Sequence, residues 1–359
     1  MIVVRPGGDT RQEDILETLK KDQTIWDIFT RKEEYSPTIT DKYGRFPHYA
    51  STERSIFEPV VSAYLLKNGF GTSYPDNKKF AVCLTHDVDS VDGKKAVLMG
   101  RIAGLANKMK KGPGRVMRSY DPNMRLWRGL EEIITLEQEN DAKSTFFFMV
   151  EDPGNEDFEY RIEELGEVIC QVGDRGWEVG LHGGHDTYLS HAAIISRKKR
   201  MERVLGRAIQ GYRNHYLRFK IPDTWVHLSE AGFKYDSTLG YSGCIGFRNG
   251  MCHPFMPFDL NRNSKIDIVE IPLIVMDRTI LSTMNLDVKS AWNLTQKTIE
   301  RVEKNQGVLT VLWHNASLLD ENMKFYKKLL EFCREKDAWM TSGQEICANV
   351  HLVRKGETI

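Results

Sequence analysis

The sequence predicts an α/β fold built on a largely parallel β-sheet. Short apolar runs end abruptly in polar residues, and segments with helical spacing of apolar residues separate these runs. The chain has 359 residues, of which 41% are hydrophobic, so it can bury a sizeable core. Buried strands that alternate with helices are typical of a parallel sheet covered on both faces. Periodicity alone does not separate a closed barrel from an open, doubly wound sheet.

The apolar runs predict six strands. They cover residues 80–84, 144–150, 177–181, 209–212, 268–276 and 308–313. The intervening segments predict helices at 126–140, 161–173, 190–205, 287–305 and 322–335. Active sites of parallel α/β folds lie at the carboxyl ends of the strands. The His, Asp and Arg residues that follow these runs are therefore the candidate site.

The first part of the chain differs from the rest. Residues 1–76 predict a small, mostly helical extension, with helices at 14–21 and 58–66 and a polar, turn-rich stretch at 33–51. A boundary in the turn-rich stretch 71–77 leaves residues 77–359 for the α/β domain. A lid, a dimer contact and a partner-docking element are all open roles for the extension. Residues 246–254 predict a loop over the mouth of the sheet, and the basic segment 108–115 a surface loop.

Composition excludes several classes of protein. The chain has 50 Lys and Arg against 50 Asp and Glu, which argues against a protein that grips nucleic acid. No apolar run approaches the ~20 residues of a membrane helix, and the first residues lack the apolar region of a secretory signal. The six cysteines are scattered and read as reduced thiols. We expect a cytoplasmic protein without a transmembrane segment.

The first candidate motif is Thr85-His86-Asp87-Val88-Asp89, directly after a predicted strand. Alternate side chains of a strand share a face, so Asp87 and Asp89 can reach one pocket. Metal-assisted hydrolysis needs one carboxylate to bind the metal and another to accept a proton. The competing interpretation is a turn, because Asp is common in loops.

A second cluster follows the predicted strand 177–181. His182, His185 and Asp186 lie within five residues and are natural ligands for zinc or a similar ion. Gly183 and Gly184 would let the backbone bend so that these side chains converge. The cluster therefore predicts a metal site.

Further candidates follow other strands. Arg213 can orient a carboxylate, and His215 or His314 can act as a general acid. Asp277 either lines the pocket or begins a turn or helix. Five aromatic residues fit either a sugar-stacking surface or the core: Tyr212, Tyr216, Trp225, Tyr241 and Trp313. No role is assigned to His48, His191, His227 and His351.

The order of these motifs resembles the polysaccharide deacetylase (NodB-homology, carbohydrate esterase) superfamily, and in particular its Thr-His-Asp-Val-Asp subset. Five motifs match in the family's order, at residues 85–89, 182–186, 211–213, 235–238 and 312–314. The resemblance implies a distorted (β/α) barrel with seven or eight strands. It also implies a metal-dependent hydrolase that removes an N-acetyl or related acyl group from a sugar. The substrate would be a carbohydrate or a glycan-lipid of bacterial surface-polysaccharide metabolism.

The resemblance implies a role for six residues: Asp87 as general base, Asp89 and His182 as metal ligands, Arg213 as the group that orients Asp87, His314 as general acid and Asp236 as the group that tunes it.

Two departures from the family pattern leave the third ligand open. The family's adjacent Asp pair is here Asp87 and Asp89, and the second His of its His-x-x-x-His pair is replaced. Register favours Asp186, four residues after His182, whereas ligand chemistry favours His185. One divalent ion is expected, with zinc favoured over cobalt, nickel, iron or manganese. An amidase acting on small cyclic or linear amides and a non-catalytic glycan-binding protein on a decayed barrel are the alternatives.

Overall fold

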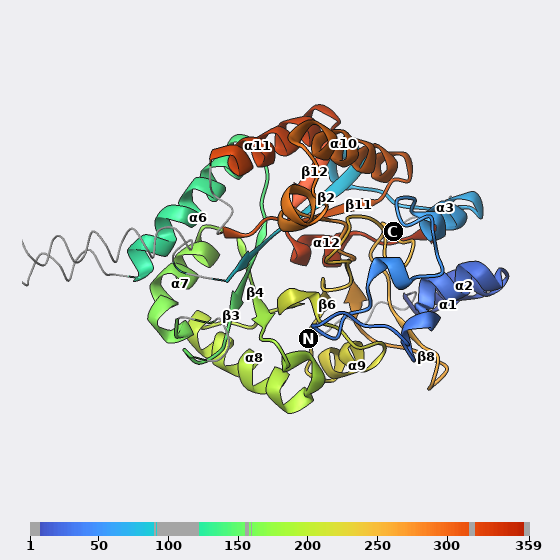
Figure 1. Ribbon diagram of the computed structural model, residues 1–359, viewed down its shortest axis with the longest axis horizontal. Helices are drawn as coiled ribbons and strands as arrows, with labels where there is room; N and C mark the ends of the chain where they lie inside the picture. The colour runs from blue at the N-terminus through green and yellow to red at the C-terminus, as the bar shows by residue number, and fades with distance from the viewer. Residues whose placement is uncertain are drawn as a thin grey trace, which may run out of the picture.

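The computed structural model describes residues 8–89, 91, 122–154, 158, 160–315 and 320–354. The basic segment 108–115 lies outside these residues. A curled, parallel sheet forms the centre of the molecule, and helices cover its outside (Figure 1). Eight strands form one row in the order β10-β11-β2-β3-β4-β5-β6-β9, and β12 pairs with β2 off this row.

All the pairs of this sheet are parallel, as predicted. The strands are β2 Phe80–Val88, β3 Thr145–Met149, β4 Glu178–Gly183, β5 Gly211–Asn214, β6 Tyr235–Asp236, β9 Val269–Glu270, β10 Val275–Met276, β11 Val308–Leu312 and β12 Ala338–Thr341. Strand β2 is central and buried along its whole length. Its start pairs with β12 and its end with β3 on the same edge. This long strand carries Asp87 to the carboxyl end of the sheet.

The predicted strand 268–276 is wrong as a single strand. Strand β9 pairs with β6 and β10 pairs with β11, at opposite ends of the row. Residues 271–274 join the two ends, and Pro272 lacks the N–H that a continuous ladder needs. The backbone N–H of Ile271 donates to Asp236 O (2.9 Å), and that of Ile274 donates to Thr310 O (3.2 Å). The segment thus bridges both ends, which confirms the distorted barrel.

The predicted helices are confirmed, with two short ones added. They are α6 Pro122–Glu139, α7 Gly166–Asp174, α8 His191–Leu205, α9 Asp223–Glu230, α10 Val288–Lys304, α11 Asp320–Glu335 and α12 Gly343–Asn349, of which α9 and α12 were not predicted. In α10 the side chains of Ala291, Thr295, Ile299 and Val302 form the buried face. Asp287 caps this helix by accepting a hydrogen bond from the backbone N–H of Ser290 (2.7 Å). Among the described helices, none has both the length and the apolarity to cross a membrane.

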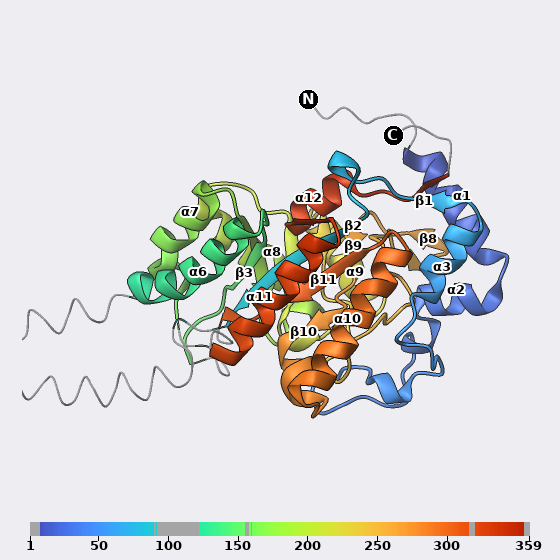
Figure 2. The same cartoon turned by 90° about the horizontal axis from the view of Figure 1, so that it is seen from above.

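The N-terminal region packs on one side of the barrel (Figure 2). It contains α1 Gly8–Lys20, α2 Gln23–Thr30 and α3 Val60–Lys67, and short 3-10 turns at Lys32–Glu34 and His48–Ala50. Buried Glu34 pairs with Arg31, with 2.7 Å between Oε1 and Nε, and also with Arg248. Strand β1 Phe70–Gly71 pairs with β13 Val353–Arg354 near the other end of the chain. The region is therefore tied to the barrel by buried charges and by backbone hydrogen bonds.

The predicted place of loop 246–254 is wrong. The carbonyl of Cys252 accepts a hydrogen bond from the N–H of Val308, at the amino-terminal end of β11. Arg248 of the same loop contacts Glu34 of the N-terminal region. The loop therefore packs away from the carboxyl ends of the strands. The structure joins none of the six cysteines in a disulfide.

Candidate active site

The predicted chemistry-bearing residues gather at the carboxyl ends of neighbouring strands. His182 in β4 lies opposite Arg213 in the register with β5. Asp87 lies near the end of β2, and Asp89 follows it. His314 follows β11, the other neighbour of β2. Because parallel strands end at one edge, residues far apart in the chain reach the same place.

Asp89, His182 and His215 form a group suited to a metal ion. One donor atom from each lies within 4.8 Å of the others. His182 Nε2 is 3.1 Å from His215 Nδ1 and 3.3 Å from Asp89 Oδ1. His182 Nδ1 must donate to the carbonyl of Arg213 (3.0 Å), because a carbonyl only accepts. In a neutral imidazole this leaves a lone pair on Nε2 that faces the group, as in metal-ligating histidines.

The carboxylates around His182 favour a positive charge at this position. Burial opposes the imidazolium form of His182, but the nearby charges of Asp87 and Asp89 outweigh it and raise the pKa of His182. Burial likewise opposes ionisation of Asp89, yet the hydrogen bond from His182 and the charges of His215 and His314 hold the pKa of Asp89 below its usual range. A divalent cation bound by two imidazoles and a carboxylate would satisfy the same demand. The residues therefore fit a divalent metal ion.

Neither residue expected as the third ligand belongs to the group. The side chain of Asp186 is 68% exposed, and its Oδ1 lies 3.0 Å from Arg218 Nη1. The ring of His185 stacks on that of His215 with 5.1 Å between centroids. The chain turns after β4 and carries both side chains past the group, whereas His215 enters it from β5. The sequence indicated His215 only as a candidate general acid. Its position two residues after Arg213, at the end of the same strand, was the feature that could have indicated a ligand.

Gly183 and Gly184 lie where an added side chain would collide with neighbouring residues. A Cβ at Gly183 would lie 2.0 Å from the hydroxyl of Tyr212, and one at Gly184 would lie 2.2 Å from Oε1 of Glu151. Neither glycine has a positive φ. The neighbouring side chains therefore leave little room for a side chain at either position.

Asp87 lies beside the metal group and next to Arg213. Asp87 Oδ2 is 3.7 Å from His182 Nε2, and Arg213 Nη1 is 3.9 Å from Asp87 Oδ1. Arg213 is fully buried, and its Nη2 donates to Ser237 Oγ (2.9 Å). The two charged groups lie side by side, and the role of Arg213 in orienting Asp87 stays a prediction.

The partner of His314 is Asp277. Their Nδ1 and Oδ1 atoms are 2.6 Å apart, and the backbone N–H of His314 donates to Oδ2 of Asp277 (3.0 Å). Burial opposes the charged ring, but Asp277 first, and then Asp89 and Asp87, raise the pKa of His314 to about 9. Asp277 therefore favours the charged form of His314, whose Nε2 lies 3.8 Å from Asp89 Oδ2.

Asp236 does not hold His314, contrary to expectation. It is fully buried and accepts a hydrogen bond from the hydroxyl of Thr238 (2.6 Å). Burial raises the pKa of Asp236 and, more strongly, that of the adjacent Glu270. Strand β6, which carries Asp236, lies several strands away from β11, so its carboxylate reaches Glu270 on the neighbouring β9 instead.

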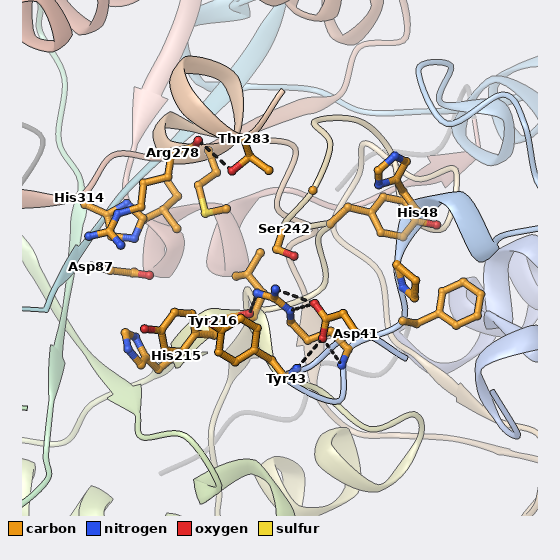
Figure 3. A pocket seen from close by; sticks show the side chains of 18 of the residues that line it. Asp41, Tyr43, His48, Asp87, His215, Tyr216, Ser242, Arg278, Thr283 and His314 are labelled. Carbon is orange, nitrogen blue, oxygen red and sulfur yellow. Dashed lines mark hydrogen bonds and ion pairs between the residues drawn. The ribbon is translucent and has the colours of Figure 1, made fainter. Parts of the chain in front are cut away.

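A cavity of about 320 Å³ opens beside these groups, within the size range of small-molecule sites. Figure 3 shows Asp87, His215 and His314 at one end and His48 at the other. Two of the predicted aromatics, Tyr216 and Tyr241, line it, whereas Tyr212, Trp225 and Trp313 are core residues. Residues 41–49 of the N-terminal region form part of the wall, including His48, for which sequence reasoning found no role.

Comparisons with known proteins agree on the fold. No family model and no curated protein matches the chain. Among solved structures, a Mycobacterium smegmatis protein named as a candidate polysaccharide deacetylase has 22% identity and a TM-score of 0.52, over 77% of this chain and 91% of that one.

Two further neighbours are more distant. They are the peptidoglycan deacetylase PdaC of Bacillus subtilis (12% identity, 76% of this chain and 91% of that one, TM-score 0.36) and a CE4 family pseudoenzyme of Bacillus anthracis (13%, 77% and 68%, TM-score 0.39). The Mycobacterium match confirms the resemblance as regards the fold.

Proposed function

We propose that the protein is a metal-dependent hydrolase that removes an N-acetyl or related acyl group from a sugar of a surface polysaccharide or a lipid-linked glycan. One observation carries this proposal. The donor group Asp89, His182 and His215 lies between the Asp87 carboxylate, which has Arg213 beside it, and His314, which is hydrogen-bonded to Asp277. This arrangement supplies a cation site, a base and an acid around one cavity.

The residues divide the work of amide hydrolysis. Asp87 would take a proton from the attacking water, and Arg213 would keep the Asp87 carboxylate aimed at it. The water oxygen forms a bond to the acyl carbon, and the carbon–nitrogen bond then breaks. His314, charged and held by Asp277, would give its Nε2 proton to the departing amine.

Asp89, His182 and His215 would hold the metal. When bound, a divalent cation supplies Lewis-acid polarisation of the acyl oxygen and lowers the pKa of water. Two imidazoles and one carboxylate favour zinc, with cobalt, nickel, iron or manganese as alternatives. Because base, acid and donor group are all present, the geometry favours an enzyme over a non-catalytic glycan-binding protein.

The test is acetate or formate release from a panel of N-acylated sugars by the zinc-loaded protein. Asp87→Asn should lower kcat by about 10²–10⁴-fold, the range for loss of a general base, while one zinc ion stays bound. Asp186→Asn is the matched control and should keep its activity, because its carboxylate is exposed and turned to Arg218. Release by Asp87→Asn at the normal rate would refute the role of Asp87. Release from small cyclic amides only would favour the amidase.

A further inference from the structure

The wall of the cavity includes a tight turn of the N-terminal region at residues 41–45. The carboxylate Oδ1 of Asp41 accepts hydrogen bonds from the backbone N–H groups of Tyr43 (2.9 Å) and Arg45 (3.0 Å). The Nε of Arg45 donates back to Asp41 Oδ2 (2.8 Å). Gly44 supplies a positive φ of 74°, which suits glycine. The turn is therefore held by its own contacts before any ligand arrives.

This turn contacts Tyr216, the residue after His215, in two ways. Arg45 Nη1 donates to the backbone carbonyl of Tyr216 (2.7 Å). The ring of Tyr43 lies flat on the ring of Tyr216, with 4.8 Å between centroids and 12° between planes. Figure 3 shows the two rings together, next to His215. One contact fixes the backbone of Tyr216 and the other fixes its side chain.

Tyr216 has a conformation that needs such support. Its φ of 56° lies in the left-handed region, and Leu217 follows with a φ of 55°. Non-glycine residues rarely adopt this region and keep it only where surrounding contacts impose it. The ring of Tyr216 lies 4.2 Å from that of His215. The backbone path after His215, and one side of its ring, therefore depend on Tyr216.

We propose that Tyr43 and Arg45 are positioning residues for His215, acting through Tyr216. The N-terminal region would thus be part of the metal centre rather than a detachable lid. The inference depends on the metal site of the proposed function, but not on the reaction or the substrate. Removing a residue that contacts and positions a metal ligand typically lowers the metal affinity by about 10–100-fold.

The experiment measures zinc affinity of the full-length, metal-free protein by competition with a chromophoric chelator. Tyr43→Ala and Arg45→Ala should each weaken zinc binding by about 10–100-fold. Tyr43→Phe keeps the stacked ring and should restore the affinity. Tyr49→Ala is the matched control, because Tyr49 lies in the same wall but is 62% exposed. The visible spectrum of the cobalt-substituted protein reports ligand geometry and should change in the two weakened variants only.

The outcomes separate this inference from the proposed function. Unchanged zinc affinity and cobalt spectrum in Tyr43→Ala and Arg45→Ala would overturn the positioning role, whatever the activity. Weakened binding together with a lowered melting temperature and no rescue by Tyr43→Phe would also overturn it, because general unfolding would then be the cause. Weakened binding with rescue would support it even in a protein that hydrolyses none of the sugars offered.

Discussion

The Asp277–His314 pair allows a quantitative test of the acid. Replacing Asp277 by Asn keeps the shape of the side chain but removes the charge that most strongly favours the imidazolium form of His314. The pKa of His314 is raised from 6.5 to about 9, which corresponds to roughly 3 kcal/mol in favour of the charged ring. Asp277 leads the causes that raise the pKa, so we expect Asp277→Asn to remove half or more of this energy.

The sign follows from the direction of the shift. In the wild type His314 loses its proton as the pH rises through about 9, whereas in the variant it would do so nearer neutrality. At pH 8 His314 would therefore be neutral in most variant molecules. The ring would also lose its charged hydrogen-bond partner at Nδ1. We expect kcat to fall by about 10²-fold or more with little change in KM, because general acids contribute about 10²–10⁴-fold.

Two measurements check this reasoning. Proton NMR of the histidine rings in the metal-free protein gives the pKa of His314 directly, without a bound cation. The pH profile of kcat for the zinc-loaded enzyme gives the alkaline limb of activity. His314→Gln identifies the resonance and serves as the control. An unchanged pKa of His314 in Asp277→Asn would refute the assignment of Asp277 as its electrostatic partner.

Three further predictions concern the metal centre and stability. His215→Ala should weaken zinc binding by more than about 100-fold, a larger effect than the loss of a residue that only supports a ligand. Asp186→Ala should change the zinc affinity by less than about threefold. The reverse order in a chelator competition would contradict the assigned ligand set. Burial raises the pKa of Glu178 from 4.5 to about 7. Between pH 4.5 and pH 7 the folded protein therefore keeps a proton on Glu178 that the unfolded chain has lost. The unfolding free energy should fall by up to about 3 kcal/mol as the pH rises through this range. Urea unfolding at pH 5 and pH 8 tests this, and Glu178→Gln should lose that part of the pH dependence. Glu34→Gln should cost about 3–5 kcal/mol of unfolding free energy, because buried Arg248 loses its charge partner and buried Arg31 keeps only Glu33. Glu58→Gln, at an exposed pair, should cost less than about 1 kcal/mol. Equal losses would show that burial is irrelevant.

The sequence predicted the positions of candidate site residues well where these residues lie in or directly after a β-strand. Alternation along β2 correctly indicated that Asp87 and Asp89 share a pocket, since both lie within 3.7 Å of His182 Nε2. Apolar runs that end in polar residues located His182, Arg213 and His314 at strand ends. These predictions depend only on local periodicity and on the rule that parallel strands end at one edge.

The sequence was less informative where the chain leaves its strands. The donor group in the structure contains His215 rather than Asp186 or His185, because the direction of a side chain in a turn follows from local dihedral angles and packing. The partner of His314 is Asp277 rather than Asp236, because β10 lies next to β11 whereas β6 lies far along the row. Neither arrangement produces a periodic pattern of residues in the sequence.

The sequence by itself therefore determined the strand–helix alternation, the family of folds and most of the polar groups at the strand ends. Only the tertiary structure decided which of these groups meet, and that residues 41–49 of the N-terminal region line the cavity. The physical reason is that local patterns specify the faces of strands and helices. The contact of Tyr43 with Tyr216 instead depends on how distant, separately folded segments pack against one another.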